Sequence, residues 1–366
     1  MMKQKNRNPL LLLALLLLAA LLFTGCGQDE ADEETETSQA DQQEPSSVEF
    51  FAMDTYMTLS AYGNDSQAVL EKGQSLITSL EDKLSAEKKG SQIAKLNKNG
   101  KADVDEDVSF LLRKAKKLYR DTDGVFNISV YPLMKAWGFT SKDYRIPSQQ
   151  TIERLLGKMD LSQLSISDDH KSAEITQKGL QVDLGGIAKG YASSETVKLF
   201  RDNGIKSALV NLGGNVQALG GKPDGSPWRV AVQSPYEDDD FLGILEIEDK
   251  ATITSGGYER NFTRNGKTYH HIMDPSTGYP ADNGLISVTI VSEDGTLADG
   301  LSTALYIMGR EKAIEYWRAH SDEFDAVLMD ENNELYVTAG LKDSFTSDTY
   351  RINDVKEQVL KAAAAR

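Results

Sequence analysis

The chain has 366 residues, which is enough for one large domain or two fused domains with a sizeable hydrophobic core. Its formal net charge of −16 argues against a nucleic-acid partner, because a nucleic-acid-binding surface needs clustered lysine and arginine. A single cysteine excludes an intramolecular disulfide and a cysteine-rich zinc site, and four histidines leave little for a histidine-rich metal cluster. The composition therefore indicates an acidic soluble enzyme or binding protein.

The first 26 residues have the pattern of a bacterial lipoprotein signal. Basic residues precede an unbroken run of leucine and alanine over residues 10–22, which is shorter than the roughly 20 residues of a membrane-spanning helix. Small residues then lead to Cys26. We expect a signal peptide over residues 1–25 and a lipid on Cys26, which would anchor an extracytoplasmic protein to the bacterial cell membrane. The alternative is an ordinary signal anchor with an incidental cysteine.

The residues after Cys26 are strongly acidic. Residues 27–50 contain nine Asp or Glu and no Lys or Arg. Since a segment of this composition cannot bury enough apolar surface to fold, we predict an acidic disordered tether over residues 26–47. The folded domain is then expected over residues 48–345, with a C-terminal tail at residues 346–366.

Apolar spacing predicts the elements of the folded domain in chain order. Alternation at residues 48–62 indicates an extended segment, and helical spacing indicates helices at residues 66–84, 107–120, 187–202 and 297–308. Strands are expected at residues 206–212, 228–233, 242–247, 285–291, 326–329 and 335–338. Because strands and helices do not alternate strictly, we expect an α+β layered body and not a doubly wound sheet. Neither common nucleotide-binding glycine pattern is present.

Two glycine pairs would let the backbone approach a ligand closely. Gly185 and Gly186 precede a predicted helix whose N-terminus favours an anion, and Lys189 adds a positive charge. The alternative for this segment is a tight turn with a surface lysine. Gly213 and Gly214 follow a strongly apolar strand, where a plain turn is the simpler interpretation.

A third segment combines a Ser-Gly-Gly loop at residues 255–257 with a pair of histidines. The Asn265-Gly266 turn predicts a hairpin that places this loop beside His270 and His271. Successive strand residues point to opposite faces, so only one of these histidines can face a site together with Asp274. A His and an Asp so close suit acid/base chemistry. The alternatives are a packed surface strand or a metal site, and the lack of further His or Cys ligands argues against zinc.

The fourth segment places Asp299 and Thr303 four residues apart on a predicted helix, so that both face one side. A carboxylate and a hydroxyl are oxygen ligands that suit Mg²⁺ or Ca²⁺ beside a phosphate. The alternative is a capping box made by Thr296 and Asp299, which would make Asp299 a helix-start residue.

Together these segments resemble the ApbE family of flavin transferases, which use FAD. The motifs that carry the resemblance occur in order at residues 84–97, 124–127, 137–139, 183–192, 254–258, 271–278 and 299–303. The resemblance implies a mixed α/β body described as T-fold-like, FAD as donor and dependence on Mg²⁺. It implies transfer of FMN, through a phosphoester, to a threonine of an extracytoplasmic redox protein, with release of AMP. Many members are lipid-anchored, which agrees with the interpretation of Cys26.

The resemblance also implies roles for individual residues. The carbonyl of Gly186, with Asp299 and Thr303, would hold Mg²⁺ beside the pyrophosphate. His271, and not His270, would be the general base. The residues expected to contact FAD are Met53, Val125, Phe126, Asn127, Asp183, Lys189, Ser255, Gly256 and His271.

Some positions depart from the family pattern. Asp54 stands in place of a glycine, Asn127 in place of an aspartate, and Gly300 in place of an alanine. Ala86 and Glu87 follow Leu84-Ser85, where the family often has an aromatic residue that Glu87 cannot replace as a stacking partner. We expect an altered flavin contact with retained chemistry. The alternatives to the transferase are an FAD pyrophosphatase that releases FMN and AMP, and a flavin-binding lipoprotein without turnover.

Overall fold

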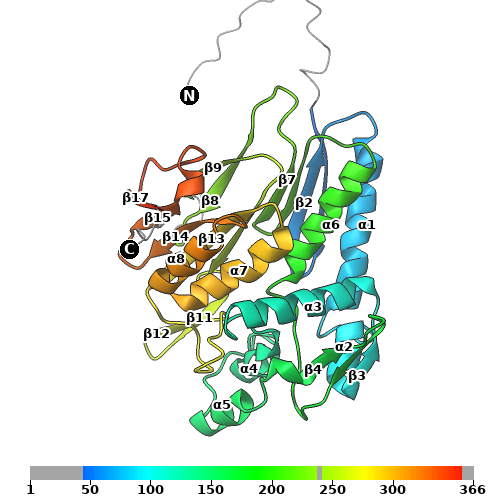
Figure 1. Cartoon of the computed structure of the whole chain (residues 1–366), viewed down its shortest axis with the longest axis vertical. Coiled ribbons are helices and arrows are strands. Elements are labelled where there is room, and N and C mark those ends of the chain that lie inside the picture. The colour runs from blue at the N-terminus through cyan, green and yellow to red at the C-terminus, as the bar shows by residue number, and fades with distance from the viewer. Residues whose placement is uncertain (1–43, 237–240, 357–366) are drawn as a thin grey trace, which may run out of the picture. The chain divides into compact units, whose positions relative to one another are not determined.

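Within residues 44–236 and 241–356, which the computed structural model describes, segments rich in alternating apolar residues build a nine-stranded sheet (Figure 1). Its order is β1-β2-β6-β7-β10-β13-β14-β15-β17, and neighbours are antiparallel except β15 and β17. The strands are β1 Ser46–Ala52, β2 Thr55–Ala61, β6 Ala208–Leu212, β7 Asn215–Leu219, β10 Ala251–Gly256, β13 Leu285–Ser292, β14 Asp325–Asp330, β15 Leu335–Thr338 and β17 Ile352–Val355.

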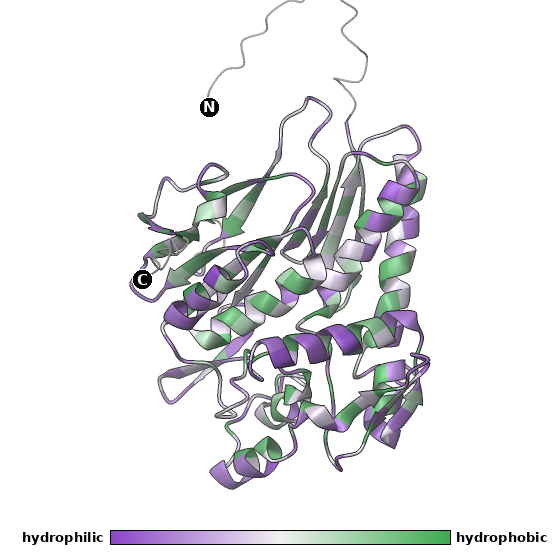
Figure 2. Cartoon of the chain, viewed as in Figure 1, coloured by the Kyte–Doolittle hydropathy of each residue, from purple (hydrophilic) through white to green (hydrophobic). Residues whose placement is uncertain are grey.

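Helices cover one face of this sheet (Figure 1). Val288 and Ile290, two apart on β13, are fully buried beneath them, as the two-residue period of a strand requires. The central helix α7 is buried along most of its length and is therefore largely apolar (Figure 2). The covering helices are α1 Ser66–Leu84, α6 Ala188–Asp202, α7 Gly295–Met308 and α8 Arg310–Ala319.

The opposite face of the sheet packs against a small sheet of order β16-β9-β8. Val291 and Val327 of the main sheet belong to this second core, together with Trp228 and Leu245 of the small sheet. The two faces of the large sheet are therefore both covered, which explains why β13 and β14 are apolar without a clear alternation. The small strands are β8 Trp228–Gln233, β9 Phe241–Ile247 and β16 Phe345–Thr346.

Smaller elements lie at the lower end of the molecule in Figure 1. A third core forms around Trp137, whose ring contacts Phe262, Tyr269 and Tyr279 and whose Nε1–H donates to Gly278 O at 3.0 Å. This packing fixes the β11–β12 hairpin and the loop after it against α4. The elements are α2 Gln92–Asn99, α3 Glu106–Asp121, α4 Tyr131–Trp137, α5 Gln149–Leu156, β3 Lys101–Asp103, β4 Leu164–Ile166, β5 Ser172–Ile175, β11 Asn261–Arg264 and β12 Lys267–His270, with 3₁₀ turns at Ile128–Val130, Leu161–Gln163 and Ala339–Leu341.

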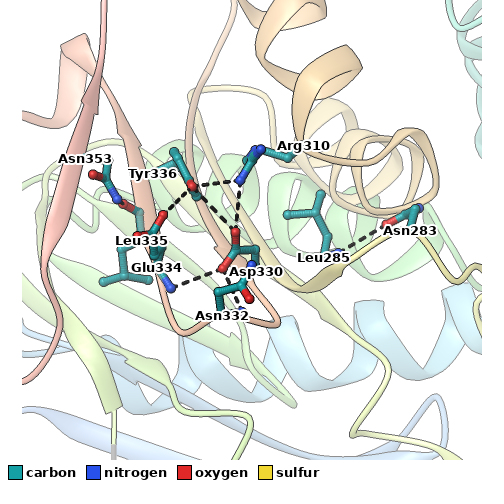
Figure 3. Close-up of polar contacts among 9 residues, drawn as sticks. All are labelled: Asn283, Leu285, Arg310, Asp330, Asn332, Glu334, Leu335, Tyr336 and Asn353. Carbon is teal, nitrogen blue, oxygen red and sulfur yellow. Dashed lines mark hydrogen bonds and ion pairs between the residues drawn. The ribbon is translucent and has the colours of Figure 1, made fainter.

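Arg310, the first residue of α8, binds two residues of the β14–β15 hairpin (Figure 3). Its guanidinium lies 3.0 Å from a carboxylate oxygen of Asp330 and donates to the Tyr336 hydroxyl at 2.8 Å. The Asp330 side chain is only 5% exposed and also accepts the backbone N–H groups of Asn332 and Glu334. This ion pair joins the helical layer to one end of the sheet, away from the residues described below.

The α+β layered body predicted from the sequence agrees with this architecture, and some boundaries differ. The predicted extended segment at residues 48–62 is a hairpin, because Met53 and Asp54 both adopt positive φ and reverse the chain. Helices α2, α4, α5 and α8 are not among the elements predicted from the sequence, because they are short. The last predicted helix begins at Gly295 with Asp294 as its N-cap, so the capping box of Thr296 and Asp299 is wrong.

The folded part extends past both expected boundaries. Strand β1 begins at Ser46, before the expected end of the tether, and β17 lies in the expected C-terminal tail yet pairs with β15. The predicted signal peptide, Cys26 and most of the predicted tether fall outside the described residues. Across the described part of the chain, no helix combines the length and apolarity needed to cross a membrane.

Candidate active site

Asp299, in the middle of α7, is held from two sides at the junction of α6, α7 and β7. Its Oδ2 accepts the backbone N–H of Gly190 at 2.8 Å, and its Oδ1 accepts the side-chain amide of Asn215 at 3.2 Å. The Oδ1 of Asn215 lies 3.3 Å from the Lys189 ammonium. The structure thus brings two predicted site residues, Lys189 and Asp299, to the same amide.

A close crossing of α6 and α7 makes this arrangement possible. A Cβ on Gly190 would lie 2.1 Å from the carbonyl oxygen of Gly295 and 2.6 Å from the Cβ of Asp299. Only glycine therefore fits at position 190, and its N–H reaches the carboxylate because no side chain intervenes. The role of Gly190 is thus to hold the Asp299 carboxylate.

Asp299 is buried, with 5% of its surface exposed, and burial raises the pKa of its carboxyl. The Lys189 charge and the hydrogen bonds from Gly190 and Asn215 act against this rise without cancelling it. A carboxylate has about four lone-pair positions, and the two hydrogen bonds use two of them. A cation placed beside the remaining positions would compensate the buried negative charge.

Hydroxyl oxygens lie next to Asp299 on the same side of α7. The Oγ of Ser255, on β10, lies 2.8 Å from Ser302 Oγ and 3.4 Å from Thr303 Oγ1. A Cβ added to Gly186 would lie 3.7 Å from Thr303 Oγ1, so the turn before α6 also reaches Thr303. The structure therefore gathers Gly186, Ser255 and Thr303, which are far apart in the sequence.

These oxygens fit a magnesium ion that also binds phosphate. Carboxylate, hydroxyl and carbonyl oxygens are hard ligands, and Mg²⁺ in phosphate sites needs only one or two protein carboxylates. Across residues 44–236 and 241–356, no group of three or more His, Cys, Asp and Glu side chains could hold a metal ion. Asp299, Thr303 and Gly186 therefore stay a prediction as metal ligands.

His270 ends β12 and His271 follows it, and the two rings have different hydrogen-bond partners. Both ring nitrogens of His270 are in use, since Nε2 lies 2.9 Å from Ala281 O and Nδ1 accepts the N–H of Ile272. His271 has its Nδ1 at 3.3 Å from Arg260 O, an acceptor that places the proton on Nδ1 and the lone pair on Nε2. Desolvation, with Arg260 and His270 nearby, lowers the pKa of His271 to about 3.

Asp274 does not form the acid/base pair that the sequence suggested. Its carboxylate accepts the backbone N–H and the hydroxyl of Ser276, at 2.8 and 2.6 Å, and so closes the turn at residues 274–278. An Asp two residues before a Ser readily makes such a turn. The role of Asp274 is thus to shape the loop after His271.

The residues expected around the flavin are spread over several elements. Met53 lies in the β1–β2 turn with φ of 46°, and Val125 and Met53 both pack on the edge of the main core. Phe126 is buried, with its ring 3.5 Å from the Cβ position of Gly186. The Asn127 side chain makes hydrogen bonds within the protein: its Oδ1 accepts the backbone N–H of Ser129, and its Nδ2 donates to Met159 O.

Asp183 precedes the Gly185-Gly186 turn and its carboxylate accepts the N–H of Gly185 at 2.6 Å. Burial raises the pKa of Asp183, while that hydrogen bond and the Arg260 charge lower it. Glu87, the departure from the family pattern, has its pKa raised by burial and then by the charges of Asp183 and Asp54. Asp183 therefore has two charged neighbours. One is Arg260, which also acts on His271, and the other is Glu87, which also feels Asp54 in the β1–β2 turn.

Three residues near the predicted set were missed from the sequence. Asn215 belongs to the second glycine motif, which was interpreted as a plain turn. Glu259 and Arg260 follow the Ser-Gly-Gly loop, and the pKa of Glu259 is raised by desolvation although Lys189 and Arg260 oppose the rise. Their closeness to glycine turns already tied to the site was the signal that could have identified them.

Comparison with known proteins gives a consistent result. The model of the ApbE family matches residues 53–328 of the chain. The chain is 32% identical, over 78% of its length and 90% of the relative's, to the "FAD:protein FMN transferase" of Klebsiella pneumoniae (strain 342). It is also 32% identical to the protein of the same name from Escherichia coli (strain K12), over 83% of this chain and 88% of that one.

Solved structures agree in fold. The ApbE protein of Thermotoga maritima superposes with a TM-score of 0.76 at 31% identity, covering 82% of this chain and 98% of that one. The flavin transferase ApbE from Vibrio cholerae has a TM-score of 0.72 at 26% identity, covering 82% and 100%. The site described above lies within residues 53–328, and the chain belongs to the ApbE family.

Proposed function

We propose that this protein is an Mg²⁺-dependent FAD:protein FMN transferase, the activity named for its relatives in Klebsiella pneumoniae and Escherichia coli. The observation that carries the proposal is that Asn215 joins the buried Asp299 carboxylate to the Lys189 ammonium, while Thr303, four residues after Asp299 on α7, has its hydroxyl beside that of Ser255. This set can hold a divalent cation and a pyrophosphate together. It suits phosphoryl chemistry, in which charge stabilisation and positioning supply most of the catalysis.

The proposed reaction breaks the phosphoanhydride of FAD and forms a phosphoester with the acceptor. The hydroxyl oxygen of an acceptor threonine attacks the FMN-side phosphorus of FAD, the bond from that phosphorus to the bridging oxygen breaks, and AMP leaves. Mg²⁺, held by Asp299, Thr303 and the Gly186 carbonyl, would supply neutralisation of the pyrophosphate charge. Lys189 adds a fixed positive charge, and the backbone N–H groups at the glycine turns are further donors to phosphate oxygens.

His271 is proposed to take the proton from the attacking threonine. With Nδ1–H directed to Arg260 O, its Nε2 lone pair is available as an acceptor. A pKa of about 3 keeps the ring neutral before substrate binds. The negative charge of a bound pyrophosphate would raise this pKa towards the range of an efficient base, because an opposite charge favours the protonated ring.

The setting of the reaction is also a proposal. Cys26 would carry the lipid that attaches the protein to the outer side of the cell membrane, and the acceptor would be a redox protein that exposes its threonine on that side. The acidic composition of residues 27–45, which precede β1, supports a tether that holds the folded part away from an anionic bilayer.

The test incubates the full chain, purified in detergent, with FAD, Mg²⁺ and a redox protein that carries a candidate threonine. We expect the acceptor to gain the mass of FMN less one water, and its Thr→Val variant to gain nothing. Release of free FMN and AMP without an adduct would favour a pyrophosphatase. FAD recovered unchanged would leave only flavin binding.

A further inference from the structure

Asn215, the first residue of β7, has a buried side chain that bridges two charged groups. It is 3% exposed, its Nδ2 donates to Asp299 Oδ1 at 3.2 Å, and its Oδ1 lies 3.3 Å from Lys189 Nζ. An uncharged amide is the side chain that can donate to a carboxylate and accept from an ammonium at the same time. The two partners also fix which end of the amide faces which residue.

The glycine turn before Asn215 explains its position. Gly213 and Gly214 have φ of 65° and 92°, and they close the β6–β7 hairpin so that Leu212 pairs with Asn215. A Cβ on Gly213 would lie 2.0 Å from Thr55 Oγ1 on the neighbouring strand, so a side chain is excluded there. The Gly213-Gly214 turn, to which the sequence assigned no function, therefore places Asn215 at the crossing of α6 and α7.

We infer that Asn215 is a positioning residue that orients the Asp299 carboxylate for a divalent cation and the Lys189 ammonium for phosphate. The inference deepens the proposed function and rests on it. Asn215 holds one oxygen of Asp299 while Gly190 N–H holds the other, so the rotation of the carboxylate plane is set before a ligand arrives. Groups that hold a metal ligand in this way typically contribute about 10- to 100-fold to metal affinity.

The chain offers a matched control in Gln217, two residues along the same strand. Gln217 is 4% exposed, and its Oε1 accepts hydrogen bonds from Ser193 and Ser194, at 2.7 and 3.3 Å. Replacing either amide by leucine removes a buried polar group from the same layer. Only the change at Asn215 removes the contacts with Asp299 and Lys189.

The experiment measures equilibrium binding of Mn²⁺ to the full-length protein in the presence of ADP, by electron paramagnetic resonance, together with thermal unfolding. ADP supplies a pyrophosphate without a flavin, so no turnover occurs. We expect Asn215→Leu to weaken Mn²⁺ binding at least tenfold and Gln217→Leu to stay within twofold of the parent. Asn215→Ser, whose hydroxyl is too short to reach both partners, should lose as much affinity and provides the result if the leucine variant does not fold.

Equal Mn²⁺ affinity in Asn215→Leu and the parent would overturn the inference, as would an equal loss in Gln217→Leu. A parent protein that binds no Mn²⁺ with ADP would overturn it too. A parent that binds Mn²⁺ with ADP but transfers no FMN would refute the proposed function alone, because the comparison of Asn215→Leu with Gln217→Leu is still decided by binding.

Discussion

The backbone N–H of Gly190 donates to Oδ2 of Asp299 over 2.8 Å, which joins the first turn of α6 to the middle of α7. A glycine at position 190 and a carboxylate at position 299 are thus parts of one structure. The absence of a side chain at Gly190 lets the two helices approach closely. Asp299 is buried there, and its carboxylate has lone pairs that neither Gly190 nor Asn215 uses. The helix packing and the proposed metal ligand are therefore coupled at this point.

Gly190→Ala should therefore damage both properties. The added Cβ would meet the Gly295 carbonyl oxygen at 2.1 Å, so the helices must separate. We expect a loss of about 1–3 kcal/mol in the free energy of unfolding, measured with urea, and weaker Mg²⁺ dependence. Gly157→Ala is the control, because Gly157 has right-handed φ and a Cβ there would have no neighbour closer than 3.8 Å. Equal effects of both changes would argue against a special role for position 190.

Thr303 should contribute to metal binding through its hydroxyl and not through its shape. Thr303→Val keeps the shape and removes the oxygen, so the Mg²⁺ concentration for half-maximal transfer should rise several-fold. Thr303→Ser keeps the oxygen and should restore the parent value within about twofold, since a metal ligand needs only the oxygen. Titration of transfer rate against Mg²⁺ checks both, and a valine variant with the parent curve would remove Thr303 as a ligand.

The neighbouring histidines should differ in what their loss does. His271→Ala should retain FAD binding and lose transfer, because the available Nε2 lone pair disappears. His270→Ala should lower the thermal midpoint, because it leaves Ala281 O and Ile272 N–H without a partner. Flavin fluorescence, transfer rate and melting curves separate these outcomes. An unchanged transfer rate in His271→Ala would exclude it as the base.

The lowered pKa of His271 predicts a pH effect on stability. The unfolded chain takes up this proton near the ordinary value of 6.5, whereas the folded chain takes it up only near a pH of 3. Protonation between these values favours the unfolded state, so His271 makes stability decrease as the pH falls from 6.5 towards 3. His271→Gln should lose less stability between pH 7 and pH 5 than the parent, measured by urea unfolding at each pH. His170→Gln, in the loop between β4 and β5 that carries none of the site residues, should behave as the parent.

The Arg310–Asp330 pair should matter for stability and not for transfer. Arg310→Met leaves the Asp330 carboxylate buried without its cation, at a cost of up to about 3 kcal/mol. Lys267→Met removes an exposed pair with Asp282, whose partners are 59% and 76% exposed, and should cost about 1 kcal/mol or less. Denaturant midpoints test this difference. A smaller loss for Arg310→Met than for Lys267→Met would contradict it.

Local patterns in the sequence predicted the parts of the site that depend on one segment. Asp299 and Thr303 share a helix face, the hairpin turn at Asn265-Gly266 forms, and His270 and His271 have different hydrogen-bond partners. The sequence could not show which segments that are far apart in the chain contact one another. The contacts of Asn215 with Lys189 and Asp299 span 26 and 84 positions, and they depend on the crossing of two helices over β7.

The same reasoning explains the errors. Asp274 was paired with a histidine because the two are close in the chain, but a turn of its own satisfies the carboxylate first. Thr296 was considered as a helix cap because the pattern fits, yet Asp294 caps the helix two residues earlier. Helices α4 and α5 are not predicted because each is short, and short helices depend on tertiary packing, which the core around Trp137 provides.

The most direct test of the proposed activity is the ratio of AMP released to FMN bound on the acceptor. The full chain, FAD, Mg²⁺ and a threonine-bearing acceptor are combined, AMP is measured by chromatography, and the acceptor is weighed by mass spectrometry. A transferase predicts one AMP for each acceptor that carries FMN on its threonine, and neither product with Asp299→Ala. AMP release in excess, with free FMN and an acceptor of unchanged mass, would contradict it.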